Sequence, residues 1–167
     1  KLNDNASPLT DRREYKLTTL NFITENNSNE NLLVFENELN LENKNLKKYK
    51  NIYLVLLSND ARRIKLGQKV LDYKSEIIND QKKRFEDLQI IDEVKFQTLA
   101  DEINSFDVVH PCIGENFSFL NSIRKKRNLE LNFVLSEEDK FSWQFSNKGF
   151  FNFKNNIPKI LTSFNLQ

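Results

Sequence analysis

The residues best placed to do chemistry in this 167-residue chain lie around its only histidine. His110 and Cys112 follow a short apolar run at 106–109, and Glu115 and Asn116 come soon after them. Open α/β sheets bind ligands at the carboxyl ends of their strands, so we predict that His110, Glu115 and Asn116 contact a cofactor. A catalytic Cys–His pair is disfavoured, because neighbouring side chains on a strand point apart. An ordinary turn and helix cap is the alternative for Glu115 and Asn116.

Arg62 and the basic run at 124–127 carry weaker signals. Arg62 lies near the expected start of a long helix, where Asp60 would cap the first turn, and it would then be free to contact a phosphate or cofactor. The basic run at 124–127 occupies four consecutive helix positions, which spread around the axis. It is typical of a solvated helix C-terminus, where cations are favoured by the helix dipole.

A third pattern combines two carboxylates with a lysine. Asp87, Glu93 and Lys95 are similar in spacing to the carboxylate and lysine set by which some nucleases hold magnesium. Short charged patterns of this kind also arise by chance in a chain with 29% charged residues.

Composition excludes several classes of function. The three glycines, at positions 67, 114 and 149, are too far apart to form a G-x-G-x-x-G fingerprint or a P-loop. One histidine with one cysteine cannot build the usual zinc sites, so we expect no metal. With 25 basic and 24 acidic residues, direct nucleic-acid binding is not expected. The lack of an apolar run of about 20 residues and the single cysteine predict a cytoplasmic protein that makes no membrane contact.

Strands of a sheet must position these residues, and apolar segments of the sequence indicate where the strands lie. Continuous apolar runs at 32–35 and 52–57 are typical of strands buried on both faces. Further strands are expected at 106–110 and 129–135, with a short one at 90–91. Helical spacing separates them, and it is clearest between residues 61 and 88. The alternation predicts a Rossmann-like α/β fold: an open, mostly parallel five-stranded sheet with helices on both faces.

Both ends of the chain differ from this middle. Residues 1–30 are rich in Asn, Ser and charge, and we interpret them as an extension or linker, with one short strand near 17–23. The α/β domain would then span 31–167. Its last segment is rich in aromatic residues and precedes a helix expected at 155–164. Exposed aromatics favour a docking surface, for which the candidates are Trp143, Phe150, Phe151 and Phe153.

Three stretches resemble the N-terminal α/β domain of the photolyase and cryptochrome family. The segment 32–43 is similar to that family's opening strand and its Arg-x-Asp-Leu-Arg-x-x-Asp-Asn turn, although Glu36 and Asn40 stand where arginines are expected. The long helix and the residues 108–116 are similar to its strand and acidic loop near the antenna chromophore. The segment 148–154 resembles its Gly-x-x-Tyr-x-x-Phe-x-x-Phe segment, with shifted aromatic spacing.

The resemblance covers about four fifths of the chain and implies a chromophore-holding or docking module. The implied ligand is an antenna chromophore, a folate or a flavin. FAD would be held only by a flavin-binding helical domain in the same or another chain, and no residue here would carry flavin photochemistry.

Two other functions remain open at this point. One is a small nucleotide-handling or metal-dependent nuclease-type enzyme that uses the loop at 110–115 or the Asp87, Glu93 and Lys95 set. The other is an interaction domain without a ligand, which makes its contacts through its terminal segments.

Overall fold

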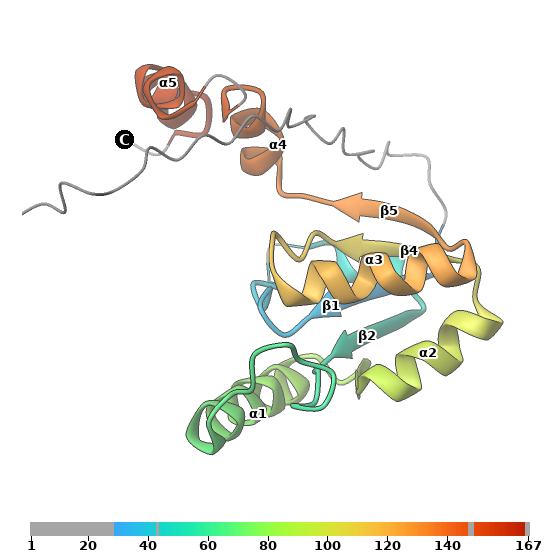
Figure 1. Cartoon of the computed structure of the whole chain (residues 1–167). Helices are drawn as coiled ribbons and strands as arrows, with labels where there is room; N and C mark the ends of the chain where they lie inside the picture. The colour runs from blue at the N-terminus through green and yellow to red at the C-terminus, as the bar shows by residue number, and fades with distance from the viewer. Residues whose placement is uncertain (1–28, 43, 147–148, 166–167) are drawn as a thin grey trace, which may run out of the picture.

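The computed structural model describes residues 29–165, apart from residue 43 and residues 147–148. The predicted extension at 1–30 and its short strand near 17–23 therefore lie almost wholly outside the described residues. The order of the elements in the rest of the chain can be followed in Figure 1.

Five parallel strands form one sheet in the order β3-β2-β1-β4-β5, which confirms the predicted open α/β fold. The strands are β1 (Asn31–Phe35), β2 (Asn51–Val55), β3 (Leu88–Ile91), β4 (Ser105–Val109) and β5 (Glu130–Val134). The helices are α1 (Gln68–Arg84), α2 (Glu93–Glu102), α3 (Glu115–Arg127), α4 (Glu137–Trp143) and α5 (Phe150–Ser163), with a short 3-10 turn η1 (Leu46–Lys48).

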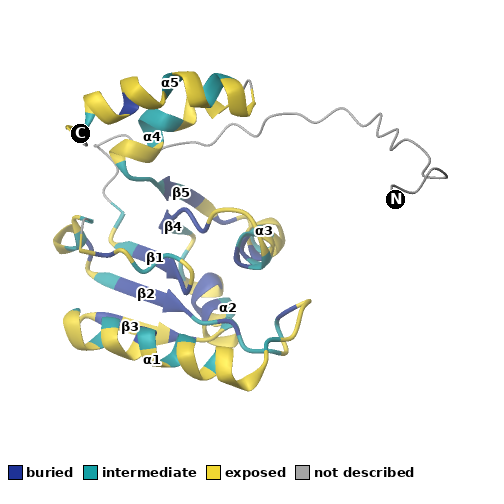
Figure 2. Ribbon diagram, turned by 90° about the vertical axis from the view of Figure 1, so that its left-hand side faces the viewer, coloured by how far each residue is buried: buried dark blue, intermediate teal, exposed yellow. Residues whose placement is uncertain are grey.

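The helices lie on both faces of the sheet. Helices α2 and α3 cover one face, whereas α1 and the β1–β2 connection that contains η1 lie on the other (Figure 2). Helices α4 and α5 lie together beyond the β5 edge (Figure 1). Strands β1, β2 and β4 are dark in Figure 2 because four residues in a row are buried in each of them.

Alternation along each strand divides the apolar residues between two core clusters. Leu33, Phe35 and Val108 pack beneath α2 and α3, whereas Leu32 and Val34 pack on the face of α1. Burial on both sides explains why β1 and β2 are continuous apolar runs after their first residue, instead of alternating ones.

The long helix begins later than its periodicity predicts. It starts at Gln68, with Gly67 as its N-cap, so the expected capping role of Asp60 is wrong. Residues 56–67 form a loop in which the Asn59 side chain closes a ring: its Nδ2 donates to the Leu66 carbonyl at 2.9 Å, and its Oδ1 accepts from the Leu66 N–H at 2.8 Å. This pair of hydrogen bonds, here called the Asn59 clasp, holds as a loop the residues that were expected to form the first turns of the helix.

The last helix begins earlier than expected. Helix α5 starts at Phe150, after Gly149 at φ 81°, and not at residue 155. The aromatics at 150–153 are therefore helical, and they lie on different sides of α5. Helix α4, which was not predicted, is capped by Ser136, whose Oγ accepts from the Asp139 N–H at 3.0 Å.

Candidate functional site

The sheet has one point at which its order reverses, and this point is the natural place for a ligand. Strands β1 and β4 are neighbours, and the chain leaves them toward opposite edges of the sheet. In open α/β sheets, ligands bind outside the carboxyl ends of the strands at this point. Here Glu36 and Asn37 follow β1, and residues 110–114 connect β4 to α3.

Two asparagines bridge this reversal point. Asn116, in the first turn of α3, donates from Nδ2 to Asn37 Oδ1 at 2.6 Å. Asn37 in turn donates to the carbonyl of Pro111 at 2.8 Å. Asn116 is only 8% exposed, and its Oδ1 is buried without a hydrogen-bond partner. A buried, unpartnered amide oxygen is costly, which makes this oxygen a candidate acceptor for a hydrogen bond from a ligand.

The N-terminus of α3 lies beside this oxygen. The N-cap is Gly114 at φ 127°, a conformation that side chains disfavour, and it provides no side-chain cap. The backbone N–H groups of the first helical turn lack partners within the helix. The unpartnered Asn116 Oδ1 and the N–H groups of the first turn therefore belong to the same end of α3.

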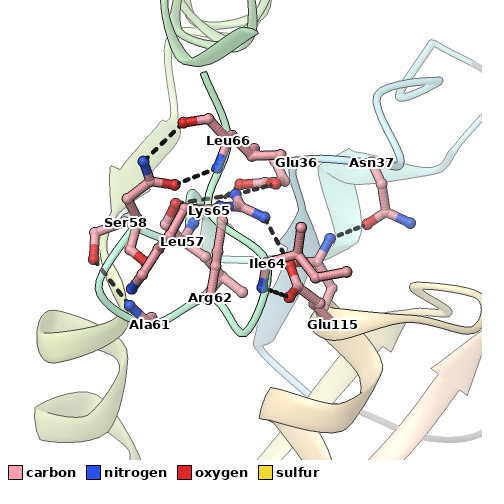
Figure 3. A network of polar contacts seen from close by, with 12 residues as sticks. Glu36, Asn37, Leu57, Ser58, Ala61, Arg62, Ile64, Lys65, Leu66 and Glu115 are labelled. Carbon is pink, nitrogen blue, oxygen red and sulfur yellow. Dashed lines mark hydrogen bonds and ion pairs between the residues drawn. The ribbon is translucent and has the colours of Figure 1, made fainter. Parts of the chain in front are cut away.

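A buried ion-pair network occupies the adjoining part of the same edge (Figure 3). Glu36, 5% exposed, accepts from Arg62, from the Leu57 N–H at 3.0 Å and from Lys74 at 3.1 Å. Arg62 also donates to the Leu57 carbonyl at 3.0 Å. Buried charges need such pairing, and Arg62 is therefore not free to bind an external phosphate through its terminal nitrogens. Its Nε is buried without a hydrogen-bond partner.

Glu115 is turned toward the same network and away from the asparagine bridge. Its carboxylate accepts from the Ile64 N–H at 2.9 Å and lies 3.6 Å from Arg62 Nη1. The hydrogen bond from the Ile64 backbone is the main cause that lowers the pKa of Glu115, with help from the Arg62 charge. Glu115 thus ties α3 to the β2–α1 loop, as Figure 3 shows.

His110 is enclosed by aromatic rings. It is 5% exposed, and its ring centroid lies 5.5 Å from Phe117, 5.0 Å from Phe133 and 5.8 Å from Trp143. Its Nδ1 accepts from the Cys112 N–H at 3.1 Å, which favours the neutral ring. Burial lowers the pKa of His110, although the Asp139 carboxylate opposes this shift. The predicted ligand contact is thus placed in a packed aromatic cluster.

Cys112 is exposed, but its thiol is not activated. Desolvation raises the pKa of Cys112, and the carboxylates of Glu38 and Asp139 raise it further. A reactive cysteine needs the opposite shift. The only bond between Cys112 and His110 is through the cysteine backbone, so the structure gives no support to a nucleophile and base pair.

The acidic set of the nuclease hypothesis is not brought together. Asp87 precedes β3 and Glu93 follows it, so the two carboxylates lie at opposite ends of one strand. Glu93 instead accepts from the N–H and hydroxyl of Ser58; these bonds lower the pKa of Glu93 although desolvation, the largest contribution, raises it. Among the described residues, no group of three or more His, Cys, Asp or Glu side chains could hold a metal ion.

The four predicted docking aromatics are separated. Phe150 and Phe151, at the start of α5, are 69% and 78% exposed. Trp143 is 45% exposed and covers His110, whereas Phe153 is half-buried. The pair α4 and α5 is held by Phe141, whose ring centroid lies 5.6 Å from that of Phe164. Exposed Ile157 and Leu161 add to the apolar surface of α5.

Sequence reasoning missed a second polar cluster, on the face of α1. Asp107 of β4 is fully buried and accepts from the Tyr49 hydroxyl at 2.8 Å, with Lys48 3.7 Å away. A cavity of about 620 Å³ opens beside it, between the β1–β2 connection and the start of α4. The one available signal was Asp107 itself, a lone carboxylate inside an apolar strand.

The chain matches no protein-family model and no curated protein. None of the helices formed by the described residues is long and apolar enough to cross a membrane.

Proposed function

We propose that this chain is an accessory module of the photolyase and cryptochrome antenna type. It holds a folate or flavin chromophore at the β1–β4 reversal point and docks a flavin-binding helical domain of the same or another chain. The observation that carries the proposal is the buried, unpartnered Oδ1 of Asn116 at this point of a sheet ordered β3-β2-β1-β4-β5.

The residues present fit one end of such a ligand. Pterin and isoalloxazine rings carry N–H groups next to carbonyl oxygens. An asparagine oxygen accepts from such an N–H, and free backbone N–H groups of α3 would donate to the carbonyl. The bridge to Asn37 at 2.6 Å fixes the orientation of the Asn116 amide. When bound, the chromophore would supply light absorption, and the protein groups would only orient it.

The apolar surface of α5 supports the docking part of the proposal. Phe150, Phe151, Ile157 and Leu161 are all exposed, and α5 contains two lysines but no acidic residue. Exposed aromatic and aliphatic side chains on one helix are typical of a surface that is covered in an assembly. A partner with an apolar, weakly acidic surface would complement it.

The enzyme alternatives have less support. His110 is packed in aromatic rings, the pKa of Cys112 is raised, and Asp87 and Glu93 lie at opposite ends of β3. We therefore assign the chemistry to the partner domain and not to this chain.

The test is ligand binding by two matched variants. Methenyltetrahydrofolate and FMN are titrated separately against the protein, and the change in chromophore absorption and fluorescence is measured. Asn116→Ala should weaken binding of the accepted ring by roughly tenfold, the effect of one lost buried hydrogen bond. Asn121→Ala changes a half-buried asparagine of the same helix that has no polar partner among the described residues, and it should leave binding unchanged. If the unaltered protein takes up neither ring, the proposal fails.

A further inference from the structure

The cavity beside Asp107 lies on the α1 face of the sheet. Its volume of about 620 Å³ falls within the roughly 300–1,000 Å³ of sites that bind small molecules. The residues of the reversal point, Glu36, Asn37 and Asn116, are not among those that line it. The cavity is therefore separate from the candidate site described above, and its lining indicates what it could hold.

Three neighbouring strands form an apolar floor. Leu32 of β1, Val109 of β4 and Val134 of β5 all line the cavity, and Val109 pairs in register with Val134. The three side chains share the α1 face of the sheet. Val134 is only half-buried, whereas Phe133, on the other face, is 4% exposed. The floor is thus apolar surface that the described residues cover only in part.

Two lysines of the β1–β2 connection line one wall of the cavity. Lys44 Nζ lies 3.9 Å from Glu38, longer than a hydrogen bond, although the Lys44 side chain is only 16% exposed. Lys48 Nζ lies 3.7 Å from Asp107, whose carboxylate accepts from the Tyr49 hydroxyl at 2.8 Å. Each ammonium group has three N–H donors, and among the described residues neither has a hydrogen-bond acceptor.

The opposite wall does not offset these two charges. Lys140 and Glu137 line it and pair with each other at 2.5 Å, so together they carry no net charge. Glu138, the other acidic residue of this wall, is exposed, where solvent and salt screen its charge. A partly buried ammonium group is costly without hydrogen bonds, so the lysine wall favours an anion.

We propose that this cavity binds a phosphate monoester with an apolar or aromatic body. The phosphate lies between Lys44 and Lys48, and the body lies on the floor formed by Leu32, Val109 and Val134. A phosphate monoester carries nearly two negative charges at neutral pH, which matches two ammonium groups, and lysine is a common phosphate ligand. The site shares no residue with the reversal point, so the proposal does not depend on a chromophore bound there.

The test is calorimetric titration of the full chain with naphthyl phosphate and, separately, with uncharged naphthol. Naphthyl phosphate should bind at least about tenfold more tightly than naphthol, because only the phosphate accepts from charged donors. Lys44→Gln and Lys48→Gln should each weaken its binding by about tenfold. Lys47→Gln is the matched control, because Lys47 is exposed in the same turn and does not line the cavity. It should change the affinity by less than about twofold.

NMR chemical shifts of the labelled full chain give the location of the bound probe. Naphthyl phosphate should shift the backbone amides of Tyr49, Val134 and Leu135, which line the cavity. Shifts confined to Phe150 and Phe151 would overturn the proposal and would place the probe on the exposed surface of α5. Equal affinities for naphthyl phosphate and naphthol, equal losses in the Lys44 and Lys47 variants, or no binding to the unaltered protein would also refute it.

Discussion

The two faces of the sheet are built differently. Beneath α2 and α3 the core is built of apolar side chains, with Phe96 and Phe106 in edge-to-face contact at 5.9 Å, and His110 is packed at its margin on Phe117 and Phe133. On the face of α1, β4 instead presents the buried carboxylate of Asp107, held by Tyr49 and Lys48. The first face stabilises the fold, whereas the second attaches the β1–β2 connection at a defined place. That connection begins with the Glu36 and Asn37 of the candidate site.

The largest effect is expected on the apolar face. Phe106→Ala removes a fully buried ring from β4 and leaves a cavity next to Phe96. We expect the free energy of unfolding to fall by about 3–5 kcal/mol, measured by urea denaturation. Phe151→Ala, on the exposed surface of α5, is the matched control and should change it by less than about 0.5 kcal/mol.

A smaller effect is expected on the polar face. Tyr49→Phe removes the hydroxyl that donates to Asp107, and the buried carboxylate loses its shortest hydrogen bond. We expect a loss of about 1–3 kcal/mol in the free energy of unfolding. The double variant Tyr49→Phe with Asp107→Leu leaves no unpaired carboxylate, so it should recover part of that loss. If the double variant lost as much stability as Tyr49→Phe and Asp107→Leu lose together when measured singly, Tyr49 and Asp107 would not act as a pair.

The smallest effect is a pH dependence on the α3 face. Burial lowers the pKa of His110 in the folded protein. As the pH falls, the imidazole of the unfolded chain therefore takes up a proton at a higher pH than the imidazole of the folded protein. Stability should therefore be fully present above about pH 6.5 and should fall toward acid, by at most about 1.4 kcal/mol per pH unit. Comparing urea midpoints at pH 7.5 and 5.5 with those of His110→Gln isolates this part. An unchanged difference in the variant would assign the pH dependence to other groups.

The strands were predictable because burial on both faces leaves a strong signal. The runs at 32–35 and 106–110 match β1 and β4 to within one residue at each end. Helix starts were less predictable: residues 61–67 fit a helical period, yet the Asn59 clasp and the buried Arg62 hold them as a loop. Period alone does not distinguish these states, because the competing interactions come from distant residues.

The candidate site was predictable only in part. Asn116 was identified from its position after a strand, but Asn37 was missed, because one asparagine in an asparagine-rich chain carries no signal. Arg62 and Glu115 were both identified, yet as ligand contacts. Their charges lie 3.6 Å apart and are directed toward each other, a pairing that depends on how three crossovers meet.

The strand order also has a consequence for the way the chain folds. β1 is the central strand, and its second neighbour, β4, lies about 75 residues later in the chain. Such distant pairing closes a large loop before its contacts can stabilise it, which slows folding. During synthesis, β1, β2 and β3 emerge first and can associate, but β1 keeps one edge open until β4 emerges. The asparagine bridge can form only after β4 has emerged, because Asn116 follows that strand in the chain.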